Sequence, residues 1–321
     1  MLPNLENYEP SSPLLWQGRQ DSLPNERYFQ KVERIDLRQQ GLESYYDAPY
    51  VIAGFCSDEG IIRNEGRAGA RSGPLSFREQ FSKLACHRNT AILDVGNITC
   101  TDGNLEFAQE EFGKVIEYCQ QHNKITLALG GGHEIAWAHY QGLHKEHPRL
   151  GIINFDAHFD LRKPPETGKG TSGTPFQQIA AFTQENQMPF RYCCIGIQRH
   201  ANTASLFETA ESLGVSTLMA DDINEMSFAW QTAFIDRFIL NEKSIYLSIC
   251  LDVFAQCFAP GVSAPQPTGL TSRQIIPLLK YIMQTGKVVA LDIAELSPPL
   301  DQGAMTARLA AVILAELLNL D

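Results

Sequence analysis

The stretch Leu150–Arg162, with the sequence LGIINFDAHFDLR, joins an apolar run to three possible metal ligands at every second position. Leu150–Ile153 has the length and apolar character of a buried strand, and an extended chain alternates its side chains between two faces. Asp156, His158 and Asp160 therefore project to one side where that strand ends. Buried carboxylates are costly unless positive charge lies among them. The stretch indicates a divalent metal site or, taken alone, an Asp-rich helix N-terminus or a satisfied polar turn.

The alternation of strand and helix repeats eight times from Tyr50 onward. The expected strands are Tyr50–Cys56, Ala91–Val95, Ile125–Leu129, Leu150–Phe155, Arg191–Ile197, Val215–Met219, Ser244–Asp252 and Lys287–Ile293. The expected helices lie near residues 75–86, 105–122, 134–146, 174–186, 203–213, 223–240, 272–285 and 303–319. This pattern predicts an α/β fold with a mainly parallel eight-stranded sheet between helices, with a closed barrel as the alternative topology. In both folds ligands bind at the carboxyl ends of strands.

The composition is that of an ordinary globular protein. Of the 321 residues, 44% are hydrophobic and 20% are charged, and the formal net charge is −11. A broad nucleic-acid or membrane surface would need a basic face, so we expect neither partner. An anionic small molecule would have to meet locally placed arginines.

The amino-terminal part differs from the rest of the chain. Residues 1–48 are polar and only weakly periodic, which predicts an irregular lead-in packed on a single domain formed by residues 49–321. The amino terminus lacks the basic and apolar regions of a signal peptide, and the apolar run Leu309–Ala315 is too short to cross a bilayer. We therefore expect a cytoplasmic protein.

The eight cysteines lack the paired spacing of a zinc finger. They are Cys56, Cys86, Cys100, Cys119, Cys193, Cys194, Cys250 and Cys257. Several fall within expected strands or helices, where a cysteine acts as a small buried hydrophobe. We expect free thiols, with Cys250 as a special case because of its neighbours.

Three further strand ends carry possible metal or catalytic groups. Gly130–Gly132 follows one strand and precedes His133, Asp252 ends another with Cys250 two residues earlier on the same face, and Glu295 follows the last strand. Singly, each has a structural explanation as a turn, a helix cap or a core cysteine. Together with the stretch after Leu150, the strand ends supply two His, three Asp, one Cys and one Glu. That convergence predicts one shared metal site.

These motifs resemble those of the arginase/agmatinase ureohydrolase superfamily in order and spacing. The matching segments are Gly131–His133, Asp156–Asp160, Ser248–Pro265 and Asp292–Glu295. Within the superfamily, Asp58–Arg71 and Ala259–Pro265 look most like the formimidoylglutamases. The resemblance implies a three-layer αβα fold and a centre of two Mn²⁺ per chain, although other divalent metals are possible. It also implies a homo-oligomer.

The resemblance also implies a ligand set. One metal would take His133, Asp156 and Asp160, and the other would take His158, Asp156 and Asp252, so that Asp156 bridges them. The family normally has a second bridging Asp where this chain has Cys250. A thiolate there is a poorer partner for Mn²⁺ than a carboxylate, so Cys250 either ligates a metal, leaves one metal weakly held or forms a redox-sensitive position.

The implied reaction is hydrolysis of a linear amidine, N-formimidoyl-L-glutamate, to L-glutamate and formamide. By family analogy Asp160 transfers the proton and Glu295 pairs with the cationic amidine. Arginase, agmatinase or guanidino-acid hydrolase activity is the alternative, as is a non-catalytic metal-binding protein because of Cys250. A nucleotide-binding protein is disfavoured because no Walker loop and no complete glycine fingerprint follows the first strand.

A substrate with two carboxylates predicts arginines near the site. The candidates are Arg63, Arg67, Arg162 and Arg199, of which Arg63 and Arg67 are preferred because glycines surround them at a strand end. The Thr171–Phe176 segment, with Ser172, occupies the place of the family's substrate loop. Arginases carry a proton-shuttling histidine in that region, which is absent here. His200 either replaces it or is an exposed structural residue.

Overall fold

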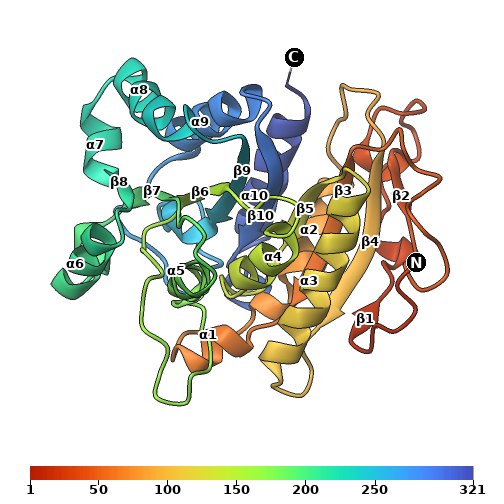
Figure 1. Cartoon of the computed structure of the whole chain (residues 1–321). Helices are drawn as coiled ribbons and strands as arrows, with labels where there is room; N and C mark the ends of the chain where they lie inside the picture. Colours follow the sequence, from red (N-terminus) through yellow and green to blue (C-terminus); the bar gives the residue numbers. More distant parts are fainter. Residues whose placement is uncertain (321) are drawn as a thin grey trace.

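The computed structural model describes residues 1–320, whose strands form one ten-stranded sheet (Figure 1). The order across the sheet is β1-β4-β3-β5-β10-β9-β6-β7-β8, and β2 pairs with β4 beside this path. The strands are β1 (Tyr8–Glu9), β2 (Val32–Arg34), β3 (Tyr50–Cys56), β4 (Ile92–Thr99), β5 (Ile125–Leu129), β6 (Leu150–Phe155), β7 (Tyr192–Ile197), β8 (Ser216–Met219), β9 (Ser244–Cys250) and β10 (Val288–Ala294). The eight expected strands are all present and pair in parallel with one another. The sheet is open, so the barrel alternative was wrong.

Helices cover both faces of this sheet (Figure 1). They are α1 (Glu59–Arg63), α2 (Gly73–Phe81), α3 (Leu105–Gln121), α4 (Ile135–Leu143), α5 (Pro175–Glu185), α6 (Ala204–Ser212), α7 (Ala220–Glu225), α8 (Phe228–Ile239), α9 (Ser272–Gln284) and α10 (Met305–Leu318). One core cluster joins the sheet to α2 and α7–α10, and a second joins it to α3–α6. The three-layer αβα arrangement is confirmed, because apolar strands buried on both faces need a helical layer on each side.

Several boundaries differ from the sequence prediction, among them that of the strand expected over Ser244–Asp252, which ends at Cys250 because the chain turns into a 3-10 helix there. The helix expected near residues 223–240 is two helices, α7 and α8, because the extended backbone of Met226 and Ser227 separates them and Ser227 caps α8. The strand expected over Ala91–Val95 continues to Thr99 through Gly96, whose φ of 84° interrupts the regular strand geometry. The short helix α1 was not predicted, since five residues are too few for a periodic signal.

Residues 1–48 add two strands to the edge of the sheet, which the weak periodicity did not predict. β1 runs antiparallel and β2 parallel to β4. The buried carboxylate of Asp94 on β4 accepts hydrogen bonds from Trp16 Nε1 at 2.7 Å and from Arg78 Nε at 2.9 Å. A Cβ at Gly96 would lie 2.3 Å from the carbonyl oxygen of Glu9, so only glycine permits this close approach. Trp16 of the amino-terminal segment and Arg78 of α2 therefore bind the same buried carboxylate.

No helix within residues 1–320 is both long and apolar enough to cross a membrane.

Candidate metal centre

The sheet order explains how residues far apart in the sequence meet. β5, β10, β9 and β6 are consecutive neighbours and parallel, so their carboxyl ends lie side by side. His133 follows β5, Glu295 follows β10, Cys250 ends β9, and Asp156 follows β6. The residues at the four strand ends that the sequence singled out therefore lie close together at one edge of the sheet.

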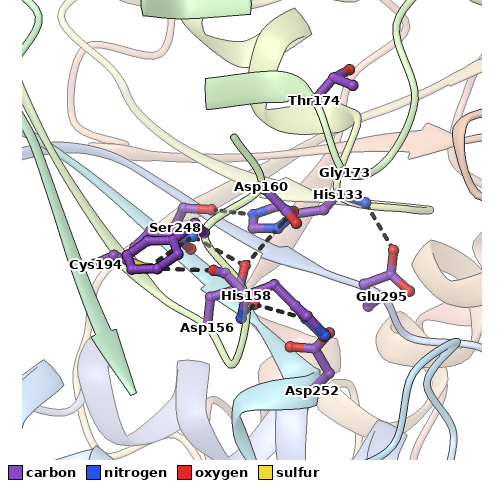
Figure 2. Close-up of polar contacts among 12 residues, drawn as sticks. His133, Asp156, His158, Asp160, Gly173, Thr174, Cys194, Ser248, Asp252 and Glu295 are labelled. Carbon is purple, nitrogen blue, oxygen red and sulfur yellow. Dashed lines mark hydrogen bonds and ion pairs between the residues drawn. The ribbon is translucent and has the colours of Figure 1, made fainter. Parts of the chain in front are cut away.

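His133 contacts two of the predicted carboxylates. Its Nδ1 lies 3.0 Å from Asp156 Oδ2 and 2.8 Å from Asp160 Oδ2, and Figure 2 shows these side chains pointing toward one another. The His133 and Asp156 side chains are almost completely buried, and 13% of the Asp160 side chain is exposed. The structure thus brings together the three residues assigned to one metal.

His158 occupies the other side of Asp156. Its Nδ1 lies 3.5 Å from Asp156 Oδ1 and 3.0 Å from Asp252 Oδ2. The ligand atoms of Asp156, His158 and Asp252 all lie within 4.8 Å of one another, as do those of His133, Asp156 and Cys250. Asp156 belongs to both groups, which is the position that a bridging carboxylate would take.

The donor set and its unsatisfied atoms fit a cation pair. His133 Nδ1 and Asp252 Oδ1 are buried and make no well-directed hydrogen bond. Buried polar atoms are normally hydrogen-bonded, so two buried atoms without a well-directed hydrogen bond at one cluster fit the binding of a cation there. Carboxylates and imidazoles suit divalent ions such as Mn²⁺, and the cluster otherwise holds three buried acidic groups with only two imidazoles to offset them.

The second nitrogen of His133 is held by a buried polar network. Ser248 Oγ donates to Asp292 Oδ1 at 2.7 Å, and it therefore accepts from His133 Nε2, which lies 2.9 Å away. The same Asp292 carboxylate accepts from the Tyr246 hydroxyl and lies 3.2 Å from His139 Nδ1. Because Nε2 carries the proton, the lone pair of Nδ1 faces the acidic cluster.

No role was predicted for Ser248 or Asp292 from sequence, although both lie within matched motifs. Their signal was period-two placement on β9 and β10: Ser248 precedes Cys250 by two residues, and Asp292 pairs across the sheet with Ser248. That pairing depends on the two strands being neighbours, which sequence alone did not fix.

The two predicted catalytic carboxyl groups sit on unusual backbone. Asp160 has φ 47° and Glu295 has φ 71°, in the left-handed region that non-glycine residues rarely adopt. Burial and the charge of Asp156 raise the pKa of Asp160 to about 6. Burial and the charge of Asp252 raise the pKa of Glu295 to about 7, although Glu295 Oε1 accepts a hydrogen bond from the His133 N–H at 3.0 Å. Both carboxyl groups are thus less acidic than ordinary Asp and Glu side chains.

The pKa values of Asp156 and Cys250, which belong to the same cluster, are also strongly shifted. Burial raises the pKa of Asp156, but close contacts with His133 and His158 outweigh burial and hold it well below its ordinary value. Burial, followed by the charges of Asp156 and Asp252, raises the pKa of the Cys250 thiol well above its ordinary value. Clusters of this kind are typical of functional sites.

A cavity of about 190 Å³ opens onto the cluster. Its lining includes six of the residues discussed above and two of the predicted substrate-binding residues. They are His133, His158, Asp160, Cys250, Asp252, Glu295, Arg162 and Ser172. A larger outer cavity of about 880 Å³ shares Asn64, Arg162 and Leu206 with it. Arg162 is exposed, lies at the junction of the two cavities and is in no ion pair within residues 1–320.

The other predicted arginines lie elsewhere. Arg63 donates to Glu59 at 2.9 Å and to Glu106 at 2.6 Å, and it lines only the outer cavity. Arg67 donates to the carbonyl oxygens of Val262 and Ser263. Neither lines the inner cavity, so the preference for this pair finds no support in the geometry.

Arg199 and His200 also lie outside the inner cavity. The guanidinium of Arg199 stacks 5.6 Å from the centre of the Phe207 ring, and Nε2 of the exposed His200 lies 3.3 Å from Gln266 Oε1. The interpretation of His200 as an exposed residue agrees with its position.

Asn202 is a site residue that sequence reasoning missed. It lines the inner cavity, donates to the Ala157 carbonyl oxygen at 2.9 Å and accepts from the Phe159 N–H at 3.0 Å. These bonds hold the backbone between Asp156 and Asp160. An asparagine in a loop carries no sequence signal of such a long-range contact.

The chain is similar to known proteins over nearly its full length. A family model described as "Arginase family" matches residues 48–319. The formimidoylglutamase of Legionella pneumophila (strain Lens) is 55% identical over 319 residues, covering 99% of both chains. The crystal structure of Trypanosoma cruzi formiminoglutamase with Mn²⁺ is 25% identical, with a TM-score of 0.78 over 88% of this chain and 96% of that one. Formimidoylglutamase from Bacillus subtilis shares the fold, with a TM-score of 0.79 at 22% identity over 90% of each chain.

Proposed function

The chain belongs to the arginase family, and on that premise we propose that it is a formimidoylglutamase. The reaction is hydrolysis of N-formimidoyl-L-glutamate to L-glutamate and formamide. One observation carries the proposal: two His and three Asp from the ends of β5, β6 and β9 form one buried cluster. The 55% identity over nearly the full length of a formimidoylglutamase selects this activity within the family.

We propose two Mn²⁺ as the resident ions. His133, Asp156 and Asp160 would hold one ion, and Asp156, His158 and Asp252 would hold the other, with Cys250 beside the first. Support comes from His133 Nδ1 and Asp252 Oδ1, which are buried in the acidic cluster without a well-directed hydrogen bond, and from the Mn²⁺ in the Trypanosoma cruzi relative. When bound, a pair of divalent ions supplies a nucleophilic water at neutral pH because it lowers that water's pKa.

The side chains of the site would divide the remaining work. Asp160 takes the proton of the attacking water and returns it to the departing nitrogen, since its side chain lies beside His133 and on the cavity lining. The Glu295 carboxylate pairs with the cationic amidine and orients its carbon toward the cluster. Both line the same small cavity, so that they can contact one substrate together.

Arg162 is the candidate that best fits a substrate carboxylate. It lies at the mouth of the inner cavity and is in no ion pair among the described residues 1–320, whereas Arg63 is already neutralised by Glu59 and Glu106. An amidine held by Glu295 would direct the amino-acid end of the substrate outward. Ser172, on the lining of the same cavity, would offer a neutral hydrogen bond there.

Product analysis tests the proposal. Manganese-loaded protein is incubated with N-formimidoyl-L-glutamate, arginine, agmatine and a guanidino acid in parallel. Formamide and glutamate from the first substrate alone are expected. Ammonia in place of formamide, or turnover of agmatine, would assign another hydrolase of the family. No turnover by protein that holds two ions would favour a non-catalytic metal-binding role.

The remaining expectations concern setting and assembly. We propose a cytoplasmic location, which the eight free cysteines favour because thiols persist in reducing compartments. Self-association stays a prediction, and light scattering of the purified protein checks it.

A further inference from the structure

We propose that Cys250 makes the ion position beside His133 a thiolate position, so that the two halves of the centre prefer different classes of metal. This inference rests on the proposed binuclear centre and adds a property of this chain to it. The position beside His133 would favour a thiophilic ion such as Zn²⁺ or Co²⁺, and the position beside His158 would accept Mn²⁺ readily.

The geometry assigns the thiol to one side of the centre. The Cys250 Sγ, a His133 nitrogen and an Asp156 oxygen lie within 4.8 Å of one another. The group around His158 is completed instead by Asp252. Cys250 ends β9, Asp252 lies in the 3-10 turn Leu251–Val253 that follows, and each belongs to a different group.

The surroundings of Cys250 differ from those of a core cysteine. Cys100, Cys119, Cys193 and Cys194 belong to the two apolar core clusters, whereas the buried Cys56 and Cys250 belong to neither, and of the eight cysteines Cys250 alone lines the inner cavity. It is 2% exposed and lines the inner cavity together with His133 and Asp252. Its neighbours are therefore metal-binding groups rather than apolar side chains.

An independent observation points to a ligand at the same spot. His133 is 1% exposed, and its Nδ1 has no well-directed hydrogen bond although it faces this cluster. With its proton on Nε2, where Ser248 accepts it, the ring would present the Nδ1 lone pair to a cation among these groups. A cation between Nδ1, the Asp156 carboxylate and the Cys250 sulfur would satisfy all three.

Ligand softness then predicts the preference. A thiolate carries the same charge as the carboxylate it replaces, so the attraction for a cation is kept while the donor becomes soft. Soft donors favour Zn²⁺ and Co²⁺ over Mn²⁺ more strongly than carboxylates do. The position beside His158 has only carboxylate and imidazole donors.

The first experiment is spectroscopic. Metal-free full-length protein is titrated with Co²⁺, and near-ultraviolet absorbance is recorded together with bound metal per chain. The expected result is a sulfur-to-cobalt charge-transfer band that saturates at one equivalent while two Co²⁺ bind. Cys250→Asp should bind two Co²⁺ without the band, and the exposed-thiol control Cys257→Ser should keep it. A wild-type protein with two Co²⁺ and no band, or a band that survives in Cys250→Asp, would overturn the proposal.

The second experiment measures whether the folded protein prefers Zn²⁺ or Mn²⁺. Wild type and Cys257→Ser, with Cys250→Asp where circular dichroism shows it folded, are dialysed against mixed Zn²⁺ and Mn²⁺, and both metals are counted per chain. Zn²⁺ binds most protein sites more tightly than Mn²⁺, so the decisive quantity is the change in their ratio. We expect Cys250→Asp to lower the bound Zn²⁺/Mn²⁺ ratio about tenfold or more, as a change in the ligand shell does. An unchanged ratio, or wild type that takes two Mn²⁺ and no Zn²⁺, would refute the inference. Neither readout uses turnover, so the proposed reaction can fail while this inference holds.

Discussion

The Ser248 hydroxyl lies 2.9 Å from Nε2 of His133 and fixes which nitrogen of that ring faces the acidic cluster. Ser248 uses its only proton on Asp292, so the ring must donate to it. The tautomer of the histidine that we propose as a metal ligand is thereby set by a side chain of β9.

We expect Ser248→Ala to lower Mn²⁺ affinity about 10- to 100-fold, because partners that orient a metal-binding histidine have effects of this size. Titration calorimetry on metal-free protein measures the change. Ser248→Thr keeps the hydroxyl and should restore most of the affinity. Ser244→Ala, at the opposite end of β9, is the matched control. An unaltered affinity in Ser248→Ala would contradict the tautomer argument.

Asp160→Asn should lower kcat about 10²- to 10⁴-fold, the usual contribution of a positioned proton-transfer group. Because Asp160 also lies among the proposed ligands, metal content is measured in the same samples. A variant that holds two ions and keeps full kcat would remove Asp160 from proton transfer.

Glu295→Gln should mainly raise KM, since the neutral amide no longer attracts the cationic amidine, and kcat falls less than in Asp160→Asn. Steady-state kinetics of both variants, at equal metal loading, separate the two roles. An unchanged KM for Glu295→Gln would place the amidine elsewhere in the cavity.

Arg162→Ala should raise the KM for N-formimidoyl-L-glutamate about 10- to 100-fold, because a charge-assisted hydrogen bond to a carboxylate is worth roughly 1.5–3 kcal/mol. Arg63→Ala is the discriminating control, because Glu59 and Glu106 already neutralise that guanidinium. If Arg63→Ala raised KM more than Arg162→Ala, the sequence-based preference for Arg63 would be right and the assignment of Arg162 wrong.

Removal of bound metal should lower the thermal midpoint of unfolding, because the acidic groups around Asp156 are left with less opposing charge. At a free Mn²⁺ concentration 100 times the dissociation constant, binding adds about 2.7 kcal/mol of stability. Scanning calorimetry with chelator, and after Mn²⁺ is restored, checks this. Equal midpoints would show that the cluster folds without need of a cation.

Arg78→Met should destabilise the protein by about 3–5 kcal/mol, since it leaves the Asp94 carboxylate buried without its partner. Arg78 and Asp94 are both fully buried and lie 2.8 Å apart. Urea unfolding measures the loss, and the exposed Arg273→Met is the control. A loss below about 1 kcal/mol would mean that Trp16 and Ser11 alone satisfy Asp94.

The strand-and-helix alternation and the chemistry-bearing strand ends were readable from the sequence because both are local patterns. Period-two placement put Asp156, His158 and Asp160 on one face, and the glycines before His133 allowed the turn that follows β5. The two edge strands of residues 1–48 were not readable, since a strand of two or three residues has no period to detect.

Tertiary structure alone decided which strand ends meet, which arginine lines the inner cavity and which side chains hydrogen-bond to His133. The order β5-β10-β9-β6 brings Cys250 close to His133, 117 positions away in the chain. It also pairs Ser248 with Asp292, 44 positions away, on the neighbouring strand. Arg63 and Arg162 look alike in sequence, and only packing shows that one is neutralised and the other is not. Local patterns follow from backbone geometry, whereas the pairing of distant strands and charges follows from how the whole sheet buries its two faces.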